Sequence, residues 1–96
     1  MRNRTAKPLG DILGELIKGM GLEGPLARGH VIATWEQIMS PQMKQHVEKC
    51  WVKGDRLFVR ISSPAWRQEL HLKRDDWRQR LNKELGADTI REIVFR

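Results

Sequence analysis

The chain has 96 residues and a formal net charge of +6, with 18 lysines and arginines against 12 aspartates and glutamates. This length allows one domain with a single modest core. One cysteine excludes an internal disulfide and a zinc site built from several cysteines. No apolar run approaches the roughly 20 residues of a membrane-spanning helix, and no signal-peptide core follows the basic N-terminus, so we expect a cytoplasmic protein with no membrane partner.

The positive charge is concentrated at the N-terminus. Arg2, Arg4 and Lys7 lie among seven residues without an acid and supply half of the net charge. We expect residues 1–8 to form a flexible basic tail and residues 9–96 to form the domain. A basic tail attracts phosphate by charge alone, so these three side chains are candidate nucleic-acid contacts. The remainder is mildly basic, which equally suits a well-solvated protein without a nucleic-acid partner.

Two helices are predicted at the start of the domain. Apolar residues recur at three- and four-residue steps from Leu9 to Met20, which is typical of an amphipathic helix. A second helix is predicted from Pro25 to about Met39, since proline suits a first helical turn. Ser40-Pro41 ends it, and residues 42–45 can form one further turn. The apolar face of the second helix carries Ala27, Val31, Thr34, Trp35 and Ile38.

From His46 the period of apolar residues changes to two, which predicts a β-hairpin with Gly54-Asp55 as its tight turn. The first strand turns Lys49, Trp51 and Lys53 to the face opposite the core. There Trp51 is either an exposed aromatic ring between two basic side chains, suited to stacking or a protein contact, or a residue covered by the N-terminal helices. These three residues are candidate exposed contacts. The inward face carries Cys50, Val52, Leu57, Val59 and Ile61.

The second strand is predicted to turn directly into a third helix. Ser63 is a good N-cap because its hydroxyl can accept from an otherwise unpaired backbone N–H, and Pro64 lacks a donor that would have had no partner. Trp66 falls in the first turn of this helix, and Leu70 follows on the same apolar side. Like Trp35, Trp66 is therefore predicted to pack in the core.

A polar stretch at residues 73–76 predicts a break before a fourth helix, with Asp75 as its N-cap. The fourth helix carries Trp77, predicted to be a third core tryptophan, and Gly86 is suited to end it. Ile90, Ile93, Val94 and Phe95 then predict a closing strand.

The predicted fold class is α+β, with the order helix, helix, strand, strand, helix, helix, strand. A hairpin makes the first two strands antiparallel, and the following helix pair is long enough for a right-handed parallel crossover. The strand from Leu57 to Ile61 is the most apolar, so we place it at the centre of a three-stranded mixed sheet. Helices then cover one face. This αββααβ arrangement with an additional N-terminal helix resembles the type II KH topology.

Little in the sequence supports catalysis, and we predict no enzyme, cofactor, metal site or small-molecule substrate. His30, His46 and His71 are scattered without carboxylate partners at ligand spacing. Cys50 alternates with Val52 on the inward side of a strand, which favours a buried thiol over a nucleophile. No glycine-rich phosphate loop follows a strand.

Basic residues gather around the junction of the third and fourth helices. Lys73, Arg74 and Arg78 are candidate phosphate contacts there. In a KH domain this junction carries a Gly-x-x-Gly loop that lets the nucleic-acid backbone approach closely. The corresponding residues 72–76 contain no glycine, and Asp75 and Asp76 dilute the positive charge. The sequence therefore predicts attraction by charge without a close-approach clamp.

The chain from Leu9 to Arg96 resembles the DciA family of bacterial proteins. The resemblance rests on the joint order and spacing of several short segments. They are Trp35-Glu36-Gln37-Ile38, Leu57-Phe58-Val59-Arg60-Ile61, Ser63-Pro64-Ala65-Trp66 with Glu69-Leu70, Leu81-Asn82-Lys83-Glu84-Leu85-Gly86, and Ile90-Arg91-Glu92-Ile93-Val94-Phe95-Arg96.

The resemblance implies a KH-like domain that binds the replicative helicase DnaB and single- or double-stranded DNA, and assists helicase loading or activity. Longer relatives in this family carry a basic C-terminal extension, and here we expect any such role to fall to Arg2, Arg4 and Lys7. The alternative is a stand-alone KH-like RNA-binding protein.

Overall fold

The computed structural model describes residues 24–96. The helix predicted from Leu9 to Met20 and the basic tail lie outside the described residues. The elements in chain order are α2 (Pro25–Ile38), α3 (Pro41–Lys44), β1 (Val47–Lys53), β2 (Arg56–Ile61), α4 (Pro64–Leu72), α5 (Arg74–Leu85) and β3 (Glu92–Phe95). The hairpin and the extra turn α3 lie where the sequence predicts them.

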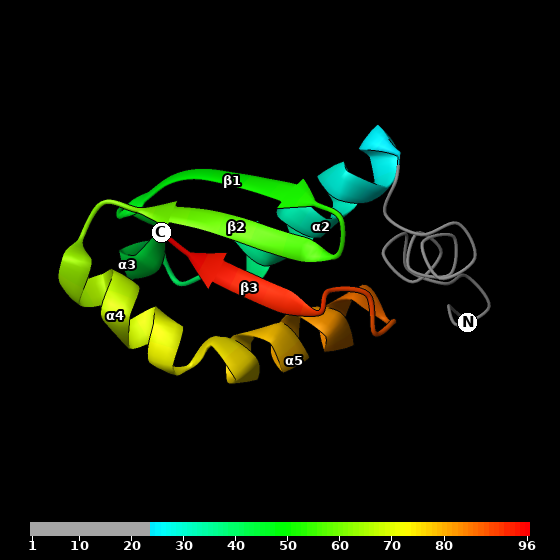
Figure 1. The fold of residues 1–96 in the computed structure, drawn as a ribbon. Coiled ribbons are helices and arrows are strands. Elements are labelled where there is room, and N and C mark those ends of the chain that lie inside the picture. Colours follow the sequence, from blue (N-terminus) through cyan, green and yellow to red (C-terminus); the bar gives the residue numbers. More distant parts are fainter. Residues whose placement is uncertain (1–23) are drawn as a thin grey trace, which may run out of the picture.

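The three strands form one mixed sheet in the order β1-β2-β3 (Figure 1). β1 and β2 are antiparallel, and β2 and β3 are parallel. The α+β class, the mixed sheet and the central position of the second hairpin strand are therefore confirmed. Gly54 begins the hairpin turn with a φ of 63°, a left-handed conformation that glycine adopts without a steric penalty.

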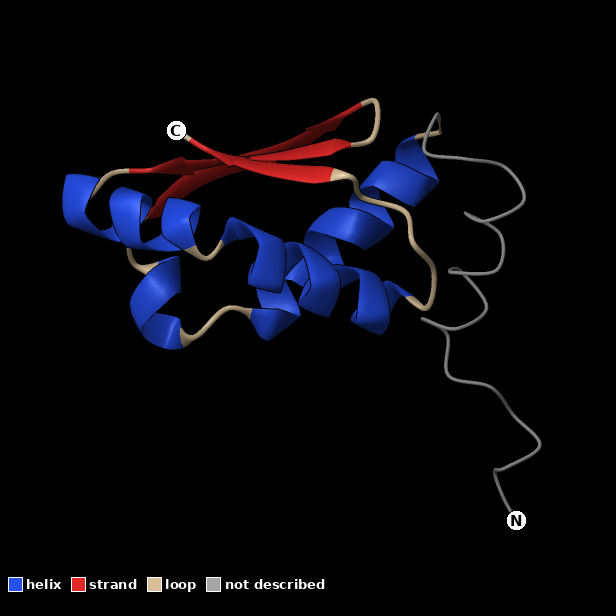
Figure 2. Cartoon of the chain, turned by 60° about the horizontal axis from the view of Figure 1, so that its bottom comes forward, coloured by secondary structure: helices blue, strands red, loops and turns tan. Residues whose placement is uncertain are grey.

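The helices lie on one side of this sheet (Figure 2). α2 packs against β1 and α5, while α5 also packs against β3. The core between the layers is apolar, and Trp35 lies at its centre with no exposed surface. Trp66 and Trp77 are partly buried and pack against this core. The predicted core packing of the tryptophans is thus confirmed for Trp35, whereas the other two lie at the rim.

Local hydrogen bonds explain why α4 begins and α5 ends where the sequence predicts. The Ser63 hydroxyl accepts from the Trp66 N–H at 3.3 Å, and Pro64 occupies the first helical turn. The Arg67 guanidinium donates to the Ile61 carbonyl at 3.0 Å, which ties α4 back to the end of β2. Gly86 ends α5 with a φ of 78°.

The predicted N-cap role of Asp75 is wrong. α5 begins at Arg74, two residues before the start that an Asp75 cap implies, and α4 ends at Leu72, so Lys73 alone separates the two helices. This short break places Asp75 inside the first turn of α5. Its carboxylate there faces the positive end of the helix and pairs with residues one turn ahead.

The last strand is shorter than predicted. It begins at Glu92 because the backbone of Ile90 is bound by another partner, the buried side chain of Asn82. Ile90 is nevertheless buried, as its place in the apolar pattern predicts. The apolar pattern thus continues through a segment whose hydrogen bonds are not those of a sheet.

Candidate nucleic-acid interface

The sheet face turned away from the helices combines aromatic and basic side chains. The core takes alternate strand residues, so the remaining ones share the opposite face. Arg96 continues this pattern, since its backbone N–H donates to Val59 at 2.9 Å. We call this surface the outer face and define it by Lys49, Trp51, Lys53, Arg56, Phe58, Arg60, Glu92, Val94 and Arg96.

Two aromatic rings lie in the middle of the outer face. Strand register sets Trp51 directly opposite Phe58, and Phe58 beside Val94. The two rings are stacked, with centroids 5.3 Å apart and planes 5° from parallel. Phe58 is 6% exposed, whereas Trp51 is only partly buried. Trp51 is therefore the ring that remains accessible, and Phe58 supports it.

Cations surround this aromatic pair. The Lys49 ammonium lies 5.5 Å from the Trp51 ring centroid, and the Arg60 guanidinium lies 5.7 Å from it. The Arg96 guanidinium lies 4.9 Å from the centroid of Phe58. Cations at such distances are attracted by the negative face of an aromatic ring. The rings and the charges thus form one continuous surface.

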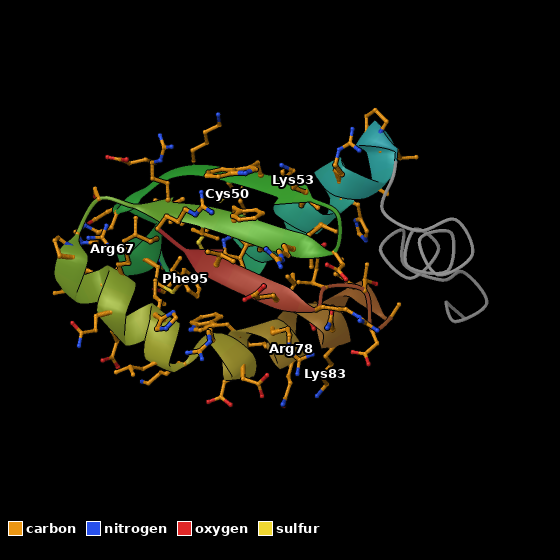
Figure 3. All side chains as sticks on the ribbon, viewed as in Figure 1. Cys50, Lys53, Arg67, Arg78, Lys83 and Phe95 are labelled. Carbon is orange, nitrogen blue, oxygen red and sulfur yellow. The ribbon has the colours of Figure 1, made fainter. Side chains whose placement is uncertain are left out.

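The outer face is strongly positive. It carries five cations and one carboxylate, Glu92, which pairs with Arg56 at 3.1 Å. Within residues 24–96 the other four cations form no ion pair with an acid. Lys53 lies at the hairpin end of β1, and Figure 3 shows it far from Arg78 on α5. Unpaired cations beside an accessible ring are typical of surfaces that bind single-stranded nucleic acid.

The basic residues at the junction of α4 and α5 are, by contrast, bound to local partners. Lys73 pairs with Glu69 at 3.0 Å, and Arg74 donates to the His71 carbonyl at 2.8 Å. Arg78 pairs with Asp75 at 2.9 Å. A phosphate would have to compete with these contacts.

The same junction borders an open groove of about 380 Å³ beside β3. The groove brings Arg74 and Arg78 together with Arg91, which the sequence reasoning missed. Arg91 also lies 3.7 Å from Asp55. The groove is lined by Leu72, Arg74, Asp75, Arg78, Arg91, Glu92 and Ile93.

The predicted contact residues differ in whether the structure describes them and in how exposed they are. Arg2, Arg4 and Lys7 lie outside the described residues. Lys49 and Lys53 are exposed, and Trp51 is partly buried on the same strand. The outer-face residues of β2 and β3 were not predicted as contacts, although strict alternation from the Gly54-Asp55 turn would place Phe58 opposite Trp51. The missed residues are Arg56, Phe58, Arg60 and Arg96.

Titratable side chains in the described part of the chain do not form a metal-binding cluster. No group of three or more His, Cys, Asp or Glu residues there could hold a metal ion. Burial raises the pKa of the Cys50 thiol to about 11, and the Glu36 carboxylate acts in the same direction. A thiol with this pKa is a poor nucleophile at neutral pH. None of the helices in residues 24–96 is long and apolar enough to cross a membrane.

Comparison with protein families gives one match that covers nearly the whole chain. Residues 8–95 match the family described as "Dna[CI] antecedent, DciA". None of the solved structures gives a significant match, so the likeness to a KH domain stays a prediction.

Among the curated proteins similar to this chain are three that are named as UPF0232 proteins. The Streptomyces coelicolor protein is 34% identical over 92 residues, which cover 94% of this chain and 48% of the relative. The Streptomyces avermitilis protein is 33% identical over 90 residues, which cover 92% of this chain and 50% of the relative. The Corynebacterium glutamicum protein is 28% identical over 90 residues, which cover 94% of this chain and 51% of the relative. The chain spans about half the length of these curated relatives.

Proposed function

Because the chain belongs to the DciA family, we propose that it is a non-enzymatic accessory protein of bacterial DNA replication. It binds the replicative helicase DnaB and DNA in the cytoplasm, and assists helicase loading or activity. The family match over residues 8–95 is the observation that carries this proposal. The outer face supports the DNA-binding part, because its unpaired cations suit a polyanionic partner.

A salt titration of DNA binding tests where the DNA lies. Replacing Lys49, Lys53 and Arg60 by glutamine should reduce the slope of log K against log salt by about two units for single strands, since each lost phosphate contact removes roughly 0.7. Replacing Lys73, Arg74 and Arg78 removes the same charge from the helix junction and is the matched control. We expect a smaller change there because those cations are paired locally.

The same titration tests the tail. Deleting residues 1–7 should reduce the slope by up to about two units for single strands, or three for duplex, if Arg2, Arg4 and Lys7 each meet a phosphate. If neither the tail deletion nor the outer-face variant changes the slope, DNA binding has no site on these surfaces. The helicase would then be the remaining partner.

Helicase binding is tested by co-elution of the full chain with DnaB from the same organism in size-exclusion chromatography. We expect a stable complex without DNA or nucleotide. Absence of a complex would contradict the adaptor role and favour the alternative, a stand-alone RNA-binding protein. Competition between single-stranded RNA and DNA of equal length at fixed salt then separates these two functions, because RNA alone offers 2′-hydroxyl groups.

A further inference from the structure

We infer that the outer face is a stacking platform for single-stranded DNA, on which an unpaired base lies against Trp51 while the surrounding cations bind the flanking phosphates. The inference rests on the proposed DNA binding and adds the site and the strandedness of the ligand. It depends on three features of the outer face: an accessible ring with a fixed orientation, cations on both sides of that ring, and the absence of a helix of residues 24–96 on this side of the sheet.

The Trp51 ring is held in place before a ligand arrives. Phe58 stacks against it at 5.3 Å, and Arg96 lies 4.9 Å from the Phe58 centroid. Phe58 is 6% exposed and so acts as a support. A ring already fixed in orientation loses little conformational entropy when a base stacks on it. β1 is an edge strand, so no strand among residues 24–96 covers the side of Trp51 away from Phe58.

Cations flank the ring along the strands. Residues two apart on a strand share a face and are separated by about 7 Å. The Cα atoms of Lys49 and Lys53 therefore lie about this far from that of Trp51 on either side, and register adds Arg60 and Arg56 opposite them on β2. A strand whose base occupies the centre thus has cations for the phosphates before and after it. Stacking with cations along the backbone is the usual way to bind single strands without sequence preference.

The shape of the outer face disfavours duplex DNA. Bases in a duplex are already stacked and paired, so their faces cannot reach a protein ring. Reading a duplex groove takes a protruding helix or β-ribbon. Within residues 24–96 no helix lies on this side of the sheet, as Figure 2 shows. A duplex could therefore meet only the cations, without the contribution of Trp51.

The charge of the outer face favours a polyanion over a protein partner. Five cations and one carboxylate surround an apolar centre of two rings and Val94. Arginine and aromatic residues are common in protein–protein interfaces too, but the cores of those interfaces are depleted in charge, whereas nucleic-acid interfaces are much more positive. We therefore assign this surface to DNA, and helicase contact at Trp51 is a contradicting outcome of the test below.

The test uses the full chain and compares two variants of one residue. Trp51→Val removes the ring but retains a good strand former, whereas Trp51→Phe retains a ring. Binding is measured by fluorescence anisotropy with labelled oligothymidine, a base-free phosphodiester strand of equal length, and a duplex. Leu26→Ala removes an exposed apolar side chain from α2, away from the outer face and from the α4–α5 junction, and serves as the control.

Trp51→Val should weaken oligothymidine binding by about 10- to 100-fold. Its affinity for the base-free strand and the duplex should be unchanged, and so should the salt slope, because no phosphate contact is lost. Trp51→Phe should recover most of the loss, and Leu26→Ala should bind as the unmodified chain does. Equal melting temperatures of the two Trp51 variants verify that the sheet is intact.

Two results would overturn the inference while leaving the proposed function in place. One is that Trp51→Val binds oligothymidine normally, while the variant with glutamine at positions 49, 53 and 60 binds it weakly. DNA would then be held by charge alone. The other is that Trp51→Val no longer binds the helicase but binds DNA as the unmodified chain does. Tighter binding to single-stranded RNA than to DNA would contradict the assignment of the ligand. If the unmodified chain binds no DNA at all, the DNA part of the proposed function fails with it.

Discussion

Replacing Trp35 by alanine should lower the free energy of unfolding by about 3–5 kcal/mol, since it leaves a large cavity in a close-packed core. The Trp35 side chain has no exposed surface. It meets Trp77 edge-to-face with centroids 5.5 Å apart, and Phe95 at 6.0 Å. It therefore joins α2 to both α5 and β3, and its removal loosens the helix layer and the sheet together.

The measurement is urea denaturation at equilibrium, with the midpoint shifted and the slope of free energy against urea unchanged. Small domains are typically stable by about 5–15 kcal/mol, so the variant should be close to unfolding at 37 °C. Trp66→Ala is the control in another helix. Trp66 is partly exposed at the rim of the core, where its ring centroid lies 5.6 Å from that of His46. A loss below about 1 kcal/mol for Trp35→Ala would contradict its place at the centre of the core.

Elements defined by local rules could be predicted well. Ser63-Pro64 indicates where α4 starts, and Gly86 indicates where α5 ends, since capping depends on a few neighbouring residues. The hairpin follows from Gly54-Asp55 between two runs of period two. The central position of β2 follows from its apolarity, which is expected of the strand with a neighbour on each side.

The errors occur where a distant partner decides the local structure. Asp75 has the chemistry of an N-cap, but α4 and α5 are separated by Lys73 alone, which leaves Asp75 no position outside the helix. Ile90 fits the strand pattern, but Asn82 takes its backbone hydrogen bonds. Such competition depends on groups brought together by the fold, so it is not visible in the periodicity of the segment itself.

The candidate site was half visible in the sequence for the same reason. Trp51 stands out because it is large and lies between two lysines on a strand with a polar face. Phe58 does not, because Leu57-Phe58-Val59 reads as one apolar run that fits a strand buried on both faces. Pairing across the hairpin separates the three residues and sends Phe58 to the outer face. The proposed binding surface therefore depends on how β1 and β2 pair, and the sequence of either strand alone does not reveal it.

The second large effect is expected at Asn82, which holds the segment leading into β3. Its side chain is 6% exposed. Its amide nitrogen donates to the Ile90 carbonyl at 2.8 Å, and its oxygen accepts from the N–H groups of Ile90 and Thr89 at 2.8 and 3.2 Å. This amide thus supplies the partners that a neighbouring strand would otherwise supply. Arg91 follows Ile90, and its backbone N–H donates to the Asp55 carbonyl at 2.8 Å. β3 begins at the residue after it.

Asn82→Ala should therefore lower the free energy of unfolding by about 2–4 kcal/mol, because it leaves buried backbone groups of Ile90 without partners. Gln79→Ala is the matched control: it removes an amide of the same helix whose hydrogen bond to Asp75 is exposed, and should cost under about 0.5 kcal/mol. Urea denaturation gives the global effect, and hydrogen exchange of the Ile90 amide gives the local one. Exchange should accelerate first at Ile90 and in β3, which carries Val94 and leads into Arg96 on the outer face. Unchanged protection at Ile90 would mean that the loop is held by burial alone, and that the Asn82 amide does not position this edge of the outer face.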